Sequence, residues 1–125
     1  DGGTVTQVLA QREETAIRPA KIAPSAAGIR QADLDELGCR TQMPLMLMHN
    51  ADDKLFPGFG SSARDWWLAC NACDSETHVD EAGCESYRRC AGATAVNYCE
   101  SSGGHRTWPQ SRNRILDFLL GPEAS

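Results

Sequence analysis

Residues 43–53 read MPLMLMHNADD. Residues 43–48 are continuously apolar, and His49, Asp52 and Asp53 follow them. Apolar residues that do not alternate with polar ones are typical of a central strand that is covered on both faces. Ligands of open α/β sheets bind where such strands end. The sequence therefore predicts a buried strand whose carboxyl end presents one imidazole and two carboxylates.

Helical and strand-like patterns alternate on both sides of this run. The predicted elements are, in chain order, a helix over residues 1–17, a brief strand within 18–25, a helix over 31–37 stopped by Gly38, a strand over 43–48, a helix that begins at the Ser62–Asp65 capping box, a strand over 93–99 and a helix over 112–120. This alternation is typical of a parallel α/β sheet. Three strands are few for such a sheet and none precedes the first helix, so the pattern is that of the second half of a larger domain.

The size and charge of the chain exclude several classes of function. Its 125 residues fit one domain. It has 12 Lys and Arg against 17 Asp and Glu, a net charge of −5 and no basic block, so the electrostatic attraction that dominates nucleic-acid binding is missing. The longest apolar run is far shorter than the roughly 20 residues of a membrane-spanning helix. We therefore expect neither nucleic acid nor a membrane as a partner.

The cysteines form an even, dense set, and most of them lie between residues 70 and 99: Cys39, Cys70, Cys73, Cys84, Cys90 and Cys99. Such a set indicates disulfides and an oxidising compartment, although the sequence does not choose among the pairings. Two alternatives stay open: zinc bound through Cys70 and Cys73 together with later cysteines, and a CxxC redox pair formed by the same two residues. The polar segment over residues 74–92 is predicted to be a surface excursion stapled by cysteines.

A glycine-rich loop carries a further histidine, because Gly103-Gly104-His105 follows the strand predicted over 93–99. A carboxylate after one strand and a histidine after the next can meet in space, where the carboxylate orients the imidazole as a general base. On residue type alone, His105 is a solvated turn residue and Asp52-Asp53 is a turn or a helix start. The nucleophile that such a pair would serve is missing.

Several motifs occur in a recognisable order: DGGT at residues 1–4 before a helix, APSAAG at 23–28, PLMLMHNADD at 44–53, and GGH at 103–105 before WP at 108–109. Together they resemble the polyhydroxybutyrate depolymerase and feruloyl esterase branch of the α/β-hydrolases, over nearly the whole chain. The resemblance implies the C-terminal half of an α/β-hydrolase sheet, with parallel strands flanked by helices. Residues 1–125 would then be one partial catalytic domain that carries a cysteine-rich excursion at about 70–99.

The resemblance also implies roles for individual residues. A nucleophilic serine is expected immediately before residue 1, with the backbone N–H of Asp1 as an oxyanion donor. His105 would be the base of a Ser-His-Asp triad, Asp53 its acid and Asp52 the fallback acid. Trp108 is a candidate substrate-binding residue for a different reason: it lies close to His105 in the sequence and could stack on an aromatic acyl group.

Two positions depart from the family pattern: Asn50 stands where glycine is usual, and Trp108 follows His105 by three residues rather than two. The function implied is that of a secreted, extracellular or periplasmic carboxylic ester hydrolase that acts with the N-terminal half of the same hydrolase, the chain alone being inactive. Its substrates would be polyester oligomers, feruloylated polysaccharide or small acyl esters, and no cofactor or metal ion is expected. The alternatives are a disulfide-stapled binding module without catalytic activity and a small zinc-binding module.

Overall fold

The apolar run forms the buried strand β1, Leu45–Asn50, in a computed structural model that describes residues 2–12, 18–105 and 112–121. Every residue of β1 is buried. The strand pairs in parallel with β4, Val96–Ser101, in a register that sets Leu45 opposite Val96 and Asn50 opposite Ser101. The prediction of a strand covered on both faces is confirmed.

The sheet is mixed rather than parallel throughout. Its strand order is β1-β4-β3-β2, with β2 at His78–Val79 and β3 at Cys84–Tyr87. Among the four strands that the described residues form, only β1 and β4 run parallel. The chain turns back tightly between β2 and β3, and the connection from β3 to β4 is too short for the crossover that parallel neighbours need. The structure is thus a mixed α/β fold with a four-stranded sheet, which corrects the prediction of parallel strands alone.

The hairpin of β2 and β3 lies within the segment that the sequence predicts to be an irregular excursion. Its turn is held by Asp80, whose Oδ1 accepts hydrogen bonds from the N–H groups of Ala82 and Cys84. Gly83 adopts a φ of 83°, which favours glycine. Both residues of β2 are exposed, so this strand lacks the apolar alternation by which strands are recognised.

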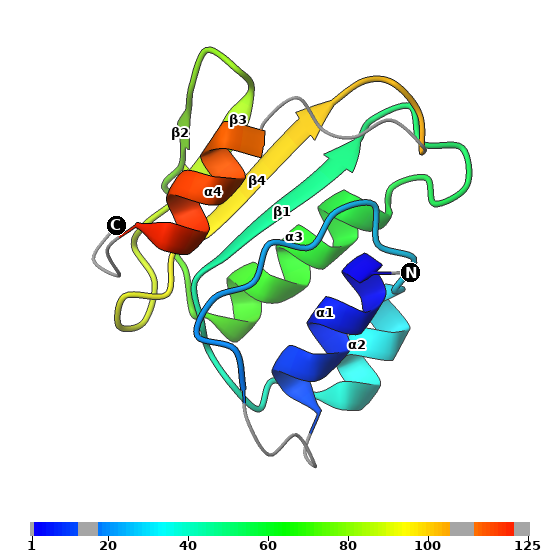
Figure 1. The fold of residues 1–125 in the computed structure, drawn as a ribbon. Helices are drawn as coiled ribbons and strands as arrows, with labels where there is room; N and C mark the ends of the chain where they lie inside the picture. Colours follow the sequence, from blue (N-terminus) through cyan, green and yellow to red (C-terminus); the bar gives the residue numbers. More distant parts are fainter. Residues whose placement is uncertain (1, 13–17, 106–111, 122–125) are drawn as a thin grey trace.

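The helices of the described residues cover the two faces of the sheet (Figure 1): α1 (Gly2–Gln11), α2 (Gln31–Leu37), α3 (Phe59–Cys70) and α4 (Arg112–Leu120). Leu45 and Leu47 of β1 belong to the core that packs against α1, α2 and α3. Met46 and Met48 point to the opposite face, where Ile115 and Phe118 of α4 pack. Successive residues of a strand point to opposite faces, so the unbroken apolar run serves both layers.

Helix α3 begins earlier than its sequence suggests. Its first residue is Phe59, and Gly58 precedes it with a φ of 74°. The N–H of Ser62 donates to the carbonyl of Gly58, a bond made inside the helix. The predicted capping box at Ser62–Asp65 is therefore wrong.

The brief strand predicted within residues 18–25 is reduced to two isolated parallel bridges with β1, Ile22 to Leu45 and Ser25 to Met48. The backbone bonds are nonetheless regular: Met48 N–H donates to the carbonyl of Pro24, and Ala26 N–H donates to the carbonyl of Met48. This segment, residues 22–26, is called the edge segment below. It extends the parallel order beyond β1.

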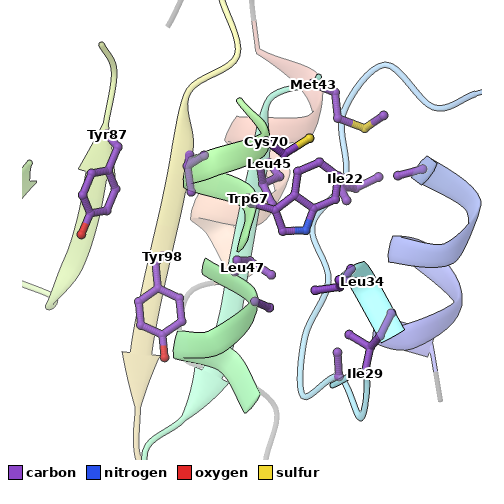
Figure 2. Close-up of a cluster of buried hydrophobic side chains, with 14 residues drawn as sticks. Ile22, Ile29, Leu34, Met43, Leu45, Leu47, Trp67, Cys70, Tyr87 and Tyr98 are labelled. Carbon is purple, nitrogen blue, oxygen red and sulfur yellow. The ribbon is translucent and has the colours of Figure 1, made fainter. Parts of the chain in front are cut away.

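Trp67 is at the centre of the larger core (Figure 2). Its side chain is fully buried, and the indole Nε1 donates to Oε1 of the equally buried Gln7, at 2.9 Å. The hydrogen bond joins α3 to α1 across the core. The Trp67 side chain therefore both fills the core and provides the hydrogen-bond donor for the buried Gln7 amide oxygen.

All six cysteines form disulfides: Cys39–Cys70, Cys73–Cys90 and Cys84–Cys99. The prediction of disulfides is confirmed, and Cys70 and Cys73 bond to different partners, so the CxxC redox pair is wrong. No thiolate is left for zinc. Three disulfides indicate an oxidising, extracellular type of environment. Among the described residues, no helix is long and apolar enough to cross a membrane.

Candidate active site

The loops that follow β1 and β4 leave the sheet side by side. The two strands are parallel neighbours and end at paired residues, Asn50 and Ser101. The N–H of Ala51 then donates to the carbonyl of Ser101. The carboxylates after β1 and the histidine after β4 are therefore brought to one edge of the sheet, as the sequence predicts.

Asp53 is buried beneath this edge, with 2% of its surface exposed. Its Oδ1 accepts hydrogen bonds from the N–H groups of Leu55 and Phe56, both at 2.9 Å, and its Oδ2 lies 2.8 Å from Nδ1 of His105. Burial on its own raises the pKa of the Asp53 carboxyl, but the bonds from Phe56, His105 and Leu55 outweigh it and hold that pKa below its ordinary value. The carboxylate is therefore ionised at neutral pH.

His105 presents one ring nitrogen to Asp53 and the other away from it. Since the Asp53 carboxylate can only accept, Nδ1 carries a proton, so in the neutral imidazole Nε2 is the nitrogen with the lone pair. Within the described residues, the bond to Asp53 is the one hydrogen bond that the His105 ring makes. The Phe56 ring meets the imidazole edge to face at 5.0 Å between centroids. The geometry is that of a general base held in one tautomer.

A hollow of about 550 Å³ opens beside this histidine. It is lined by Asp52, Lys54, Leu55, Gly103, Gly104 and His105. The His105 side chain is 26% exposed, whereas that of Asp53 is 1% exposed. A reactant can therefore reach the base without reaching the carboxylate that orients it.

A second histidine lies beside Asp53. His49 is buried, and its Nε2 donates to the carbonyl of Phe56 at 2.8 Å. The same Nε2 atom lies 3.5 Å from Oδ2 of Asp53. Its position agrees with a structural role. The part played by Phe56, which contacts both histidines and donates to Asp53, is missed by sequence reasoning, since a single phenylalanine in a loop carries no pattern.

Asp52, the fallback acid, makes no hydrogen bond with His105 in the described part of the chain. Its carboxylate instead accepts from the N–H groups of Gly103 and Gly104. The hydrogen bonds from Gly104 and then Gly103 hold the pKa of Asp52 below its ordinary value. The geometry thus pairs Asp53, rather than Asp52, with the imidazole.

Two predicted site residues, Asp1 and Trp108, lie outside the described residues. The first described turn of α1 packs close to the edge segment, because a Cβ on Gly3 would lie within 3.0 Å of the carbonyl oxygen of Ser25. Gly3, rather than Gly2, is therefore the glycine that this close approach requires. No hydroxyl group of the described residues hydrogen-bonds His105, and the Ser101 hydroxyl donates to Asn50 instead.

No protein-family model matches the chain, and no curated protein matches it either. The resemblance to the esterase branch of the α/β-hydrolases therefore stays a prediction from its motifs. Among the described residues, no group of three or more His, Cys, Asp or Glu side chains is arranged to hold a metal ion.

Lowering the pH below about 4 should destabilise the fold through Asp53. The pKa of the folded Asp53 carboxyl lies below its ordinary value, so the carboxylate contributes stability above its unfolded pKa, and that contribution is lost as the pH falls through the folded pKa. Asp53→Asn should be less stable than wild type at about pH 7 and lose less further stability between about pH 5 and pH 3. Urea unfolding at each pH measures both effects.

The matched control is Asp35→Asn in α2, an exposed acid without a hydrogen bond in the described residues. It should follow the pH dependence of the wild type. An Asp53→Asn profile parallel to that of the wild type would contradict the stabilising role of the Asp53 carboxylate.

Gly60→Ala should lower the free energy of unfolding by about 1–3 kcal/mol. A Cβ at this position of α3 would clash with Cβ of His49. His49 is buried and lies beside Asp53, so it has little room to move. Gly2→Ala is the control, since nothing lies within 4 Å of its added Cβ and alanine favours a helix. Thermal melts of both variants test this, and equal stability of the two would refute the close packing of Gly60 on His49.

Proposed function

We propose that the chain is the C-terminal part of a secreted carboxylic ester hydrolase of the α/β-hydrolase fold, similar to polyhydroxybutyrate depolymerases and feruloyl esterases. The observation that carries the proposal is the hydrogen bond of 2.8 Å between Nδ1 of His105 and Oδ2 of the buried Asp53. The pair lies at the carboxyl ends of adjacent parallel strands, where α/β sheets carry their ligand sites.

The chemistry assigned to the pair is that of a serine esterase. Nε2 of His105 takes the proton of a serine hydroxyl as its oxygen attacks the ester carbonyl, and returns that proton to the leaving alcohol. Asp53 holds the ring in the productive tautomer and stabilises the imidazolium. Water then attacks the acyl-enzyme with His105 again as base. The serine is expected immediately before Asp1, whose backbone N–H would donate to the oxyanion.

The order of strands supports this assignment. The edge segment, β1 and β4 occur in this order in the sequence, lie side by side in the sheet and run parallel. The β2–β3 hairpin is an insertion between β1 and β4 that adds antiparallel strands beyond β4. If the parallel sheet continued past the edge segment in the same order, the next strand would come before α1 in the sequence. That strand would lead directly into α1.

The open side of the edge segment supports the N-terminal half of the hydrolase as partner. Within the described residues, the backbone groups of Ala23 that point away from β1 have no hydrogen-bond partner, so they can pair with another strand. Large apolar side chains are exposed on the helices of both faces: Val5 and Leu9 of α1, and Leu116, Leu119 and Leu120 of α4. Burying them would be favourable.

The substrates proposed are polyester oligomers, feruloylated polysaccharide or small acyl esters. No residue of the described hollow separates these classes. Trp108, the candidate for an aromatic acyl contact, lies outside the described residues.

Hydrolysis of p-nitrophenyl acetate tests the proposal. The chain alone should show no turnover above background, because its base lacks a nucleophile, and the chain together with the N-terminal half should hydrolyse the ester. Turnover by the chain alone would point to Ser25, Ser101 or Ser102 and overturn the external serine. A folded complex without turnover would favour a non-catalytic binding module stapled by the three disulfides.

A further inference from the structure

The turn that carries His105 is built from two glycines. Gly103 has a φ of 128° and Gly104 a φ of 73°, values that other residues rarely adopt. Glycine also has the widest choice of backbone conformations, so a Gly-Gly turn does not fix the direction of the residue that follows it. The orientation of His105 must therefore be set by contacts from elsewhere.

Asp52 makes the first of these contacts. Its Oδ1 accepts from the N–H of Gly103 at 3.0 Å and from the N–H of Gly104 at 2.9 Å, and its Oδ2 lies 3.2 Å from the same Gly103 nitrogen. Successive N–H groups that converge on one anion form a strong cradle. Asp52 is itself exposed, so its contribution is through these bonds rather than through core packing.

Asn50 binds the carbonyl of Gly104, in the peptide group that leads directly to His105. Its Nδ2 donates to the carbonyl of Gly104 at 2.6 Å, and its Oδ1 accepts from the Ser101 hydroxyl at 2.8 Å. Both the N–H and the carbonyl of Gly104 are thus bound by side chains from the end of β1, directly before His105. Asn50, which stands where glycine is usual in the family pattern, thus supplies one of the two hydrogen bonds to Gly104.

We infer that Asp52 is a positioning residue, whose carboxylate holds the Gly103-Gly104 turn so that Nδ1 of His105 meets Asp53. The adjacent acids have separate tasks: Asp53 binds the imidazole, and Asp52 binds the backbone that delivers it. The consequence for catalysis rests on the proposed function, in which His105 is the base. The effect of Asp52 on the hydrogen bond between His105 and Asp53 is independent of that function.

The test compares Asp52→Ala with Asp52→Asn in the chain labelled with ¹⁵N-histidine. Asparagine keeps an Oδ1 that can accept from both glycine N–H groups, whereas alanine removes it. The readout is the ring N–H proton of His105 in NMR spectra, which is observed when a hydrogen bond protects it from exchange. The buried His49 ring serves as an internal reference for folding. Glu81→Ala, which removes an exposed acid in the β2–β3 turn, is the control for loss of charge.

We expect the His105 ring proton to be present in wild type, Asp52→Asn and Glu81→Ala, and lost in Asp52→Ala while the His49 signal persists. Retention of the His105 signal in Asp52→Ala would overturn the inference, as would its loss in Asp52→Asn. Loss of the His49 signal together with that of His105 in Asp52→Ala would make Asp52 a residue for global folding, which also overturns it.

Kinetics of the complex with the N-terminal half separate this inference from the proposed function. Asp52→Ala should lower kcat on the order of 100-fold with little change in KM, and Asp52→Asn should restore it. If the NMR result is as expected but the wild-type complex does not hydrolyse esters, the positioning role stands and the proposed function fails.

Discussion

Replacing His105 by alanine is expected to lower kcat/KM for ester hydrolysis by at least about 10⁴-fold in the proposed complex with the N-terminal half. In the proposed mechanism the imidazole takes the serine proton, and the His105 ring is held by its hydrogen bond to Asp53. Without it, the hydroxyl has no base, and only substrate binding and oxyanion stabilisation remain. Steady-state hydrolysis of p-nitrophenyl acetate by purified variants measures the loss.

His78→Ala is the control for this experiment, because His78 lies exposed in β2, outside the candidate site. Its kcat/KM should equal that of the wild type. If His105→Ala kept most of the activity, His105 would be the solvated turn residue that its sequence environment alone suggests, and its hydrogen bond to Asp53 would have only a structural purpose.

Replacing Trp67 by alanine should lower the free energy of unfolding by about 3–5 kcal/mol. The indole is fully buried, and its removal leaves a cavity in the core between α3 and α1 (Figure 2). It also takes away the donor to Oε1 of Gln7, whose Nε2 is already without a partner in the described structure. The core would lose both packing and a buried hydrogen bond. Urea unfolding followed by circular dichroism measures the effect.

Trp66→Ala is a closely matched control, since the neighbouring indole has the same size and is only partly buried. The two rings lie edge to face at 5.2 Å, so Trp66→Ala should cost clearly less than Trp67→Ala. Equal losses would show that the adjacent tryptophans share one core environment and would contradict the arrangement described.

The fold was predictable where the sequence carries a strong periodic or composition signal. The unbroken apolar run specified β1, and Gly38 specified the end of α2, where its N–H donates to Leu34. The hairpin of β2 and β3 was not predictable, because its strands are short and polar and are held by the turn at Asp80 and the Cys84–Cys99 disulfide. Its antiparallel pairing made the sheet mixed.

The start of α3 was missed for a different reason. A Ser-x-x-Asp sequence satisfies the local rule for a helix start, but Gly60 lets the helix continue upstream by packing against His49. That contact joins residues distant in sequence, and no local pattern encodes it.

The even, dense set of cysteines indicated disulfides, whereas their pairing required the three-dimensional fold.

At the candidate site, the sequence supplied the residues and the structure supplied their distances. Strands that end at one edge of the sheet predict that a carboxylate meets His105, and the resemblance implies that this carboxylate is Asp53. The side chains of Asp53 and His105 lie within hydrogen-bond distance. The bonds of Asp52 and Asn50 to the glycine turn could not be inferred, because they depend on backbone orientation in a second loop.

The decisive experiment for the proposed triad is labelling of the complex with a fluorophosphonate probe, followed by peptide mass spectrometry. We expect one modified serine, immediately before Asp1-Gly2-Gly3, and loss of the label in His105→Ala. A folded complex that takes up no label, or a label on Ser25, Ser101 or Ser102, would contradict the claim that Asp53 and His105 serve an external serine nucleophile.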